Sequence, residues 1–317
     1  MNESTQSVHA ALLPFLGVLR IGGDDAVRFL QGQLTNDVQL LADGRTQLAA
    51  YNTPQGRVIA LPRLHQGDDA IYALLPTELL ERVSALLRRF VLRSRVDLQI
   101  ATDLQVGWIG TAALSPALAD EAAYDATRTV SALPGATATH MVSFDYAPGR
   151  QVIAVPPDAW RSITGLSATR AHPRILDEWL AADIRDGQPQ VFAATSEAFV
   201  PQMLNLDLLE GISFTKGCYT GQEIVARTQN LGRIKRRMFR FSVTGGPAPA
   251  AGDKLVEGTA HAGDVVSSAS VGSSVEFLAV VNLDQVHRSL RLAAAPEFPL
   301  SLLPLPYPVE APPRSQS

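Results

Sequence analysis

The spacing of apolar residues changes partway along this chain, and that change limits the folds open to it. Residues 76–92 (PTELLERVSALLRRFVL) and 172–187 (HPRILDEWLAADIRDG) carry apolar side chains at helical spacing, and each follows strand-like runs. After about residue 236, short alternating runs separated by Gly, Ser and Asp turns replace the helical pattern. The sequence therefore predicts an α+β region followed by a small β-barrel or sandwich.

Local signals refine this prediction. The helix at 76–92 is expected to begin with Thr77 as its cap and to bury one apolar face. That face comprises Leu79, Leu80, Val83, Leu86, Leu87 and Phe90. A strand is predicted at 211–214 (GISF), and it leads into a glycine-hinged turn and a second helix.

Composition indicates a soluble globular protein. The 317 residues are 46% hydrophobic and 18% charged, with a net charge of -4, so the chain can bury a core and is not expected to be coated in nucleic acid. No run approaches the roughly 18 apolar residues of a membrane span, and the N-terminus lacks the basic start of a secretory signal. We expect a cytoplasmic protein that makes no membrane contact.

Cys218 is the only cysteine, and it lies in the stretch KGCYTGQE. A single cysteine forms no internal disulfide, and the six histidines are scattered along the chain. No closed zinc or iron–sulfur site can therefore be built from this chain alone, and no metal ligands are assigned.

The setting of Cys218 favours a reactive thiol. Thr220 and Glu223 match a capping box, so a helix is expected to start at Gly221, just after the cysteine. The positive end of that helix, with Lys216 two residues away, would favour the thiolate. The alternative is a small, half-buried turn cysteine without a chemical role.

A run of basic residues follows the cysteine and has two interpretations. It could grip a polyanion such as RNA or a polyglutamate tail, or it could be a solvated strand edge that discourages aggregation. On a strand its side chains would alternate between two faces. The run comprises Arg227, Arg233, Lys235, Arg236, Arg237 and Arg240.

Several motifs together resemble the YgfZ family of folate-binding proteins, which belongs to the superfamily of the glycine-cleavage T-protein, an aminomethyltransferase. The most specific is FTKGCYTGQEIVART, preceded by WLAADIRDGQP and FVPQMLNLDLLEGI. IGGDDAVRFLQGQLTND, NTPQGRV and LRSRVDL also look like that family. The similarity runs from about residue 12 to residue 243.

The resemblance implies a T-protein-like α+β fold: a ring of two ferredoxin-like modules and a C-terminal antiparallel β-barrel, with tetrahydrofolate in the central hole. The two modules would occupy residues 1–235 and be intertwined in sequence. The barrel would occupy 236–295, and a proline-rich tail would follow at 296–317.

The same resemblance assigns roles to individual residues. Cys218 would be the reactive thiol or a ligand to a transient iron–sulfur cluster shared with a partner, with Lys216 beside it. Trp179 lies where the family has a folate-contacting tryptophan, and a second aromatic contact would fall near Phe15 or Leu16. The expected cofactor-binding residues are Trp179, Tyr219, Phe15, Leu16, Gly217, Glu223, Arg227 and Arg233.

Two departures separate this chain from the aminomethyltransferases. Ala60 and Leu61 occupy the places assigned to their aspartate pair, whose carboxylate carries the catalytic role, and T-proteins lack the KGCY cysteine. The resemblance therefore implies a folate-binding accessory protein for iron–sulfur enzymes, including those that modify tRNA. Its partners would be iron–sulfur carrier or client proteins. The alternatives are a divergent folate-dependent one-carbon transferase and a direct RNA-binding module, against which the acidic net charge weighs.

Overall fold

The computed structural model describes residues 9–43, 45–110, 141–147, 149–164, 174–230, 234–272 and 274–309. The chain forms two compact units, and each is assembled from separate stretches of sequence. The first unit comprises residues 1–32, 37–48 and 62–176, and the second comprises 33–36, 49–61 and 177–317. The predicted division into 1–235, 236–295 and 296–317 stays a prediction.

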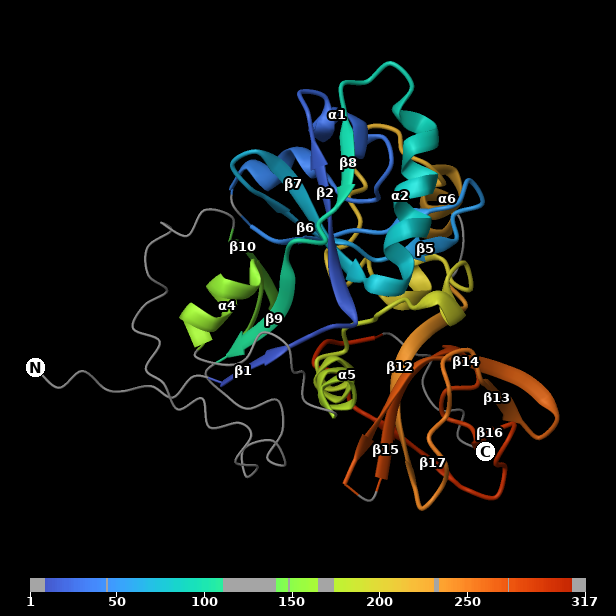
Figure 1. Cartoon of the computed structure of the whole chain (residues 1–317). Coiled ribbons are helices and arrows are strands. Elements are labelled where there is room, and N and C mark those ends of the chain that lie inside the picture. Colours follow the sequence, from blue (N-terminus) through green and yellow to red (C-terminus); the bar gives the residue numbers. More distant parts are fainter. Residues whose placement is uncertain are drawn as a thin grey trace, which may run out of the picture. The chain divides into compact units, whose positions relative to one another are not determined.

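The first unit contains two antiparallel sheets (Figure 1). One has the order β1-β9-β11-β10, from His9–Leu12, Gln105–Gly110, Arg150–Val155 and Val142–Ala147. The other has the order β3-β6-β7-β2-β8, from Gln47–Leu48, Arg63–Gln66, Ala70–Pro76, Leu16–Gly22 and Asp97–Ile100. Within the described residues, the helices of this unit are α1 (Ala26–Gln31), η1 (Val38–Asp43), α2 (Thr77–Val91) and α4 (Pro157–Thr164).

Helix α2 packs on strands β2, β7 and β8, as its apolar spacing predicts. Two details of the prediction were wrong. Thr77 is the first helical residue rather than the cap, and its hydroxyl donates a hydrogen bond of 3.1 Å to the Pro14 carbonyl. Phe90 is 46% exposed, because it lies in the last turn, beyond the sheet that covers Leu87.

A glycine fixes the packing of helix α4. Gly107 of β9 lies directly under the ring of Trp160, and a Cβ atom at this position would come within 2.1 Å of that ring. The absent side chain lets the indole sit fully buried against the sheet, beside Ile153 and Val155.

The second unit contains a hairpin and a six-stranded antiparallel sheet. The hairpin pairs β4 (Tyr51–Asn52) with β5 (Val58–Ala60). The sheet has the order β16-β13-β14-β15-β12-β17, from Leu290–Leu292, Lys254–Glu257, Ala260–Val271, Ser274–Asn282, Arg236–Thr244 and Leu300–Leu303. Its edge strands β16 and β17 contact each other, so the sheet curls toward a barrel, as predicted.

The barrel core is aromatic and aliphatic. Phe241 stacks on Phe277 with ring centroids 5.6 Å apart, and valines from β12, β14 and β15 surround the pair. The proline-rich tail contributes strand β17, which pairs with β12. The unit also holds most of α5 (Ile175–Arg185), η3 (Ala193–Thr195), η4 (Pro201–Leu204) and α6 (Gln222–Asn230). None of the helices in the described ranges is long and apolar enough to cross a membrane.

Candidate functional site

The only cysteine lies in an irregular segment of the second unit, residues 211–221, which we call the cysteine loop. The strand predicted at 211–214 does not form. Instead of joining a sheet, the segment bonds to residues 34–36: the Ser213 amide donates to the Thr35 carbonyl at 3.0 Å, and the Thr35 hydroxyl donates to the Gly211 carbonyl at 2.7 Å. Because buried backbone groups need partners, these bonds replace the missing sheet ladder.

Lys216 anchors the loop from inside. Its side-chain ammonium donates hydrogen bonds to the carbonyls of Leu34 (2.8 Å) and Asn36 (2.6 Å), and the residue is 9% exposed. The ammonium also lies 5.2 Å from the ring centroid of Tyr219, within cation–π range. Lys216 is thus bound to the backbone of residues 34–36, a role that its predicted place beside the thiol did not include.

Cys218 lies on the outside of the same loop. Its thiol is exposed, and the neighbouring Gly217 has open space where a side chain would be. Tyr219 turns inward, and burial raises the pKa of its phenol to about 12, so the phenol stays neutral at physiological pH. Residues of the loop therefore serve different purposes: Lys216 and Tyr219 are buried and hold it, while Gly217 and Cys218 between them face solvent.

The helix after the loop differs from the predicted one at its first turn. Helix α6 begins at Gln222, one residue after the predicted start. The predicted capping box was wrong, because the Glu223 carboxylate accepts a 2.7 Å bond from Arg227 one turn later, and no bond joins it to Thr220 in the described part of the chain. Glu223 and Arg227 form an exposed pair on the helix surface.

Two sequence motifs meet behind the cysteine loop. Gly221 has a φ of +80°, and a Cβ atom there would lie 2.6 Å from the Thr53 carbonyl and 2.9 Å from the Cα of Gly56. Gly56, also at positive φ, packs against Ile224 of α6. NTPQGRV and KGCYTGQE are therefore neighbours in the fold, and only glycine fits where they touch.

The predicted aromatic contacts belong to different units. Trp179 of α5 is 1% exposed, so its ring is inside the protein. In the first unit, Phe15 is half-buried in the turn between β1 and β2, and Leu16 begins β2. Leu16 lines a cavity of about 280 Å³, together with apolar residues that include Val18, Leu80, Leu104 and Val106.

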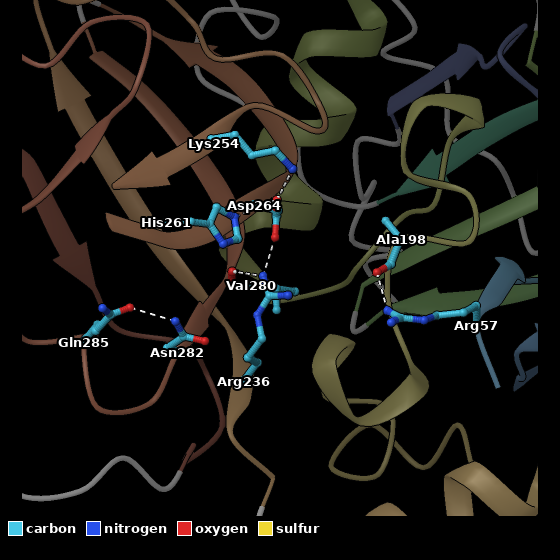
Figure 2. A network of polar contacts seen from close by, with 9 residues as sticks. All are labelled: Arg57, Ala198, Arg236, Lys254, His261, Asp264, Val280, Asn282 and Gln285. Carbon is cyan, nitrogen blue, oxygen red and sulfur yellow. Dashed lines mark hydrogen bonds and ion pairs between the residues drawn. The ribbon is translucent and has the colours of Figure 1, made fainter. Parts of the chain in front are cut away.

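Three arginines of the basic run are paired with carboxylates and do not form an open cationic face. Arg236 pairs with Asp264, Arg237 makes two bonds of 2.6 and 2.8 Å to Asp207, and Arg240 pairs with Glu276 at 2.6 Å. Lys254 and His261 also bond to Asp264, at 2.5 and 3.1 Å, so three cationic or titratable side chains meet at one carboxylate (Figure 2). These three arginines are therefore paired within the protein. The predicted alternation of the run between two faces stays a prediction. Arg233 lies outside the described residues.

Ala60 and Leu61, at the places assigned to the transferase aspartates, are fully buried. Ala60 ends strand β5 and Leu61 follows it. The hairpin is joined to residues 196–199 by hydrogen bonds. The Ser196 hydroxyl donates to the Ile59 carbonyl at 2.8 Å, and the Arg57 guanidinium donates to the Ala198 carbonyl at 2.8 Å (Figure 2).

Sequence reasoning missed the residues that hold the cysteine loop. Thr35 is fully buried and bonds on both sides, to the Gly211 carbonyl and the Ala50 amide. Asn36 donates a 2.7 Å bond to the Glu210 carbonyl. The polar pair directly after Leu34, in QLTND, was the signal available, because polar side chains that are buried are nearly always hydrogen-bonded.

The chain is similar to known proteins in sequence and in fold. No family model matches the chain. It is 31% identical over 299 residues to the tRNA-modifying protein YgfZ of Klebsiella pneumoniae (strain 342), covering 92% of this chain and 90% of that protein. It is 31% identical to the protein of the same name from Pectobacterium carotovorum subsp. carotovorum (strain PC1), covering 90% and 87%.

Among solved structures, the glycine cleavage system aminomethyltransferase T from Bartonella henselae superimposes with a TM-score of 0.65 over 95% of this chain and 87% of that one. Sequence identity in that comparison is 16%, so the likeness concerns the fold. It confirms the predicted T-protein-like fold class.

Proposed function

This chain belongs to the YgfZ family of tRNA-modifying proteins, and from that membership we propose that it is a cytoplasmic, tetrahydrofolate-binding accessory protein for the assembly or repair of iron–sulfur enzymes, including enzymes that modify tRNA. The observation that carries the proposal is the cysteine loop. Its interior residues hold it firmly while its single thiol faces solvent.

The thiol is the group of this loop that can act on a partner. An exposed thiol can be deprotonated and can then act as a nucleophile or a metal ligand. One cysteine supplies one ligand, so a cluster at Cys218 would take its other ligands from a carrier or client protein. The bonds of Lys216 and Thr35 fix the loop backbone, and a fixed thiol loses less conformational freedom when it meets a partner.

The residues assigned to folate fit it in part. Leu16 lines an apolar cavity of about 280 Å³, close to the lower end of the roughly 300–1,000 Å³ of small-molecule sites, which suits one ring system. Arg227 is the exposed arginine of the predicted set and suits the anionic glutamate tail. Trp179 is buried, so stacking on a pterin requires its ring to be uncovered. When bound, folate would supply a carrier for a one-carbon unit.

The buried apolar pair Ala60 and Leu61 argues against aminomethyl transfer by the T-protein route. No carboxylate is available at those two places to stabilise positive charge on the reacting nitrogen, an effect often worth about 100-fold or more. We therefore propose an accessory role rather than transferase activity.

The test is complementation in a strain that lacks the gene for this chain. Aconitase activity and tRNA methylthiolation are measured after return of wild type, Cys218→Ser or Thr215→Ala. Thr215 is a matched control, since it is exposed in the same loop. We expect wild type and Thr215→Ala to restore both activities, and Cys218→Ser to fold normally but restore neither.

Two results would contradict the proposal. Full rescue by Cys218→Ser would remove the thiol from the mechanism, and failure of wild type to rescue would remove the iron–sulfur role. Folate binding is measured separately, by calorimetry with tetrahydrofolate on wild type, Trp179→Phe and Arg227→Ala. No detectable binding by wild type would refute the cofactor assignment.

A further inference from the structure

A leucine at the end of helix α2 has an unusual backbone conformation. The helix ends at Val91, and the Ser94 amide bonds back to the Val91 carbonyl at 2.7 Å, which closes a tight turn. Leu92, the first central residue of that turn, has φ 44° and ψ -102°. These angles are near the first central position of a type II′ turn, where glycine is preferred because a Cβ atom is crowded there.

The strain at Leu92 is not offset by burial. The side chain is 87% exposed, the most exposed large hydrophobic residue in the described part of the chain. Glycine would relieve the strain and remove an apolar side chain from water. Strained residues that persist are often found at functional sites. An external partner for this side chain would account for its retention.

The surroundings indicate the chemistry of that partner. Phe90, two residues earlier, is 46% exposed, so two large apolar side chains within three residues are open to solvent. Residues 82–95 hold five arginines and no aspartate or glutamate. Arg88 bonds to the Leu98 carbonyl and Arg95 pairs with Asp24, whereas Arg89 and Arg93 are exposed and have no ion pair within the described residues. The patch is therefore apolar at its centre and basic at its rim.

Three kinds of occupant fit this patch poorly. A membrane would need a broad apolar face, but that face of α2 is buried through Leu79, Leu80 and Leu87. A second copy of the chain would oppose arginines to arginines. RNA would satisfy the arginines and stack on an aromatic ring, but it has no pocket for an extended leucine.

We propose that residues 89–93 are a docking site for a protein whose contact face has an apolar pocket rimmed by aspartate and glutamate. Leu92 and Phe90 enter the pocket, while Arg89 and Arg93 pair with the rim. Protein interfaces have this arrangement, with aromatic and arginine residues over-represented where binding energy concentrates. The inference rests on the proposed function in one respect, since an accessory protein must dock on a carrier or client.

The test uses the full chain in cells, with the photocrosslinker p-benzoylphenylalanine in place of Phe90. The same crosslinker in place of Leu40, a 59% exposed leucine of the same unit, is the control. A protein adduct specific to position 90 is identified, purified and titrated against wild type, Leu92→Gly and Arg89→Glu/Arg93→Glu. We expect Leu92→Gly to weaken binding by about tenfold or more and added salt to weaken it further.

Thermal stability shows whether a loss of binding by Leu92→Gly comes from the missing side chain or from misfolding. Leu92→Gly should keep or raise the Tm by about 1–4 °C, whereas Leu40→Gly, within η1, should lower it. Any one of four results would overturn the proposal. These are a nuclease-sensitive adduct, a lipid adduct, adducts equal to those at position 40, and an unchanged affinity of Leu92→Gly for the partner. If wild type fails complementation but the Leu92-dependent complex persists, docking stands and the iron–sulfur role fails. If Leu92→Gly gives full rescue and binds with unchanged affinity, docking fails and the iron–sulfur role stands.

Discussion

Arginines are concentrated in two stretches, residues 82–95 and 227–240, and the fold treats the two stretches differently. In strand β12, Arg236, Arg237 and Arg240 meet carboxylates that lie 28, 30 and 36 residues away in the sequence. At the end of α2, Arg89 and Arg93 have no such carboxylate among the described residues. An arginine is thus available to an external partner only where the fold brings no acid to it, and the sequence around it carries no information on that point.

The largest effect should come from breaking a buried pair on β12. The side chains of Arg237 and Asp207 are 11% and 7% exposed. Asp207→Ala leaves the guanidinium buried without its counter-charge, and we expect a loss of about 3–5 kcal/mol in the free energy of unfolding, measured by urea denaturation. Asp158→Ala, which removes the partner of exposed Arg161, should cost less than about 1 kcal/mol. Equal losses in the free energy of unfolding for Asp207→Ala and Asp158→Ala would show that the Arg237–Asp207 pair is not buried as the geometry indicates.

A smaller loss is expected at the buried lysine of the cysteine loop. Lys216→Met keeps much of the side-chain volume but leaves the Leu34 and Asn36 carbonyls without their donor. Unsatisfied buried groups cost about 1–3 kcal/mol, and the loop backbone should exchange its amide hydrogens faster. Cys218→Ser, two residues away and exposed, should change stability by less than about 0.5 kcal/mol. If Lys216→Met leaves the free energy of unfolding unchanged, Lys216 does not anchor the loop.

Lowering the pH should reduce the free energy of unfolding, because acid weakens the ion pairs and hydrogen bonds made by the Asp264 carboxylate. Burial raises the pKa of the Asp264 carboxyl, but bonds from Lys254, Arg236 and His261 outweigh it, so the net pKa lies below the usual 3.8. A carboxyl with a lowered folded-state pKa stabilises the fold above its unfolded pKa, and that stability is lost as pH falls through the folded value. Urea unfolding at pH 5 and pH 3 should show the decline, and Asp264→Asn should reduce the slope. An unaltered slope would contradict the assignment.

The smallest effect should come from the arginines of α2. Arg89→Ala and Arg93→Ala remove exposed side chains, so the free energy of unfolding should change by no more than about 0.5 kcal/mol. Arg240→Ala, which breaks a pair whose side chains are 17% and 12% exposed, should cost more. If all three variants lose similar stability in thermal melts, the distinction between the two stretches collapses.

Local patterns predicted the elements better than their contacts. Helical spacing predicted 76–92 and 172–187, where helices run Thr77–Val91 and Ile175–Arg185. The same spacing assigned Phe90 to the buried face, because periodicity does not reveal where the covering sheet ends. Residues 211–214 alternate like a strand, but the Ser213 amide donates to the carbonyl of Thr35, far away in the sequence, which no local pattern could reveal.

At the candidate site too, the sequence predicted the local arrangement better than the contacts. The motif around Cys218 predicted a thiol in a turn shortly before a helix, and the structure places Cys218, which is exposed, in the loop that leads into α6. It also suggested a lysine beside the thiol, whereas the ammonium bonds to carbonyls 182 and 180 residues away in sequence. Glu223 matched a capping box by spacing but pairs with Arg227, since an exposed carboxylate has several partners within reach.

The bond from the Thr35 hydroxyl to the Gly211 carbonyl has a consequence for synthesis. The two residues are 176 positions apart, so at about 5–20 residues per second a ribosome needs roughly 9–35 s to deliver the second after the first. During that interval, residues 33–36 and 49–61 of the nascent chain have emerged ahead of the rest of the unit to which they belong. Shielding of these early segments by a chaperone would then matter more to the yield of this protein than the speed of any later folding step.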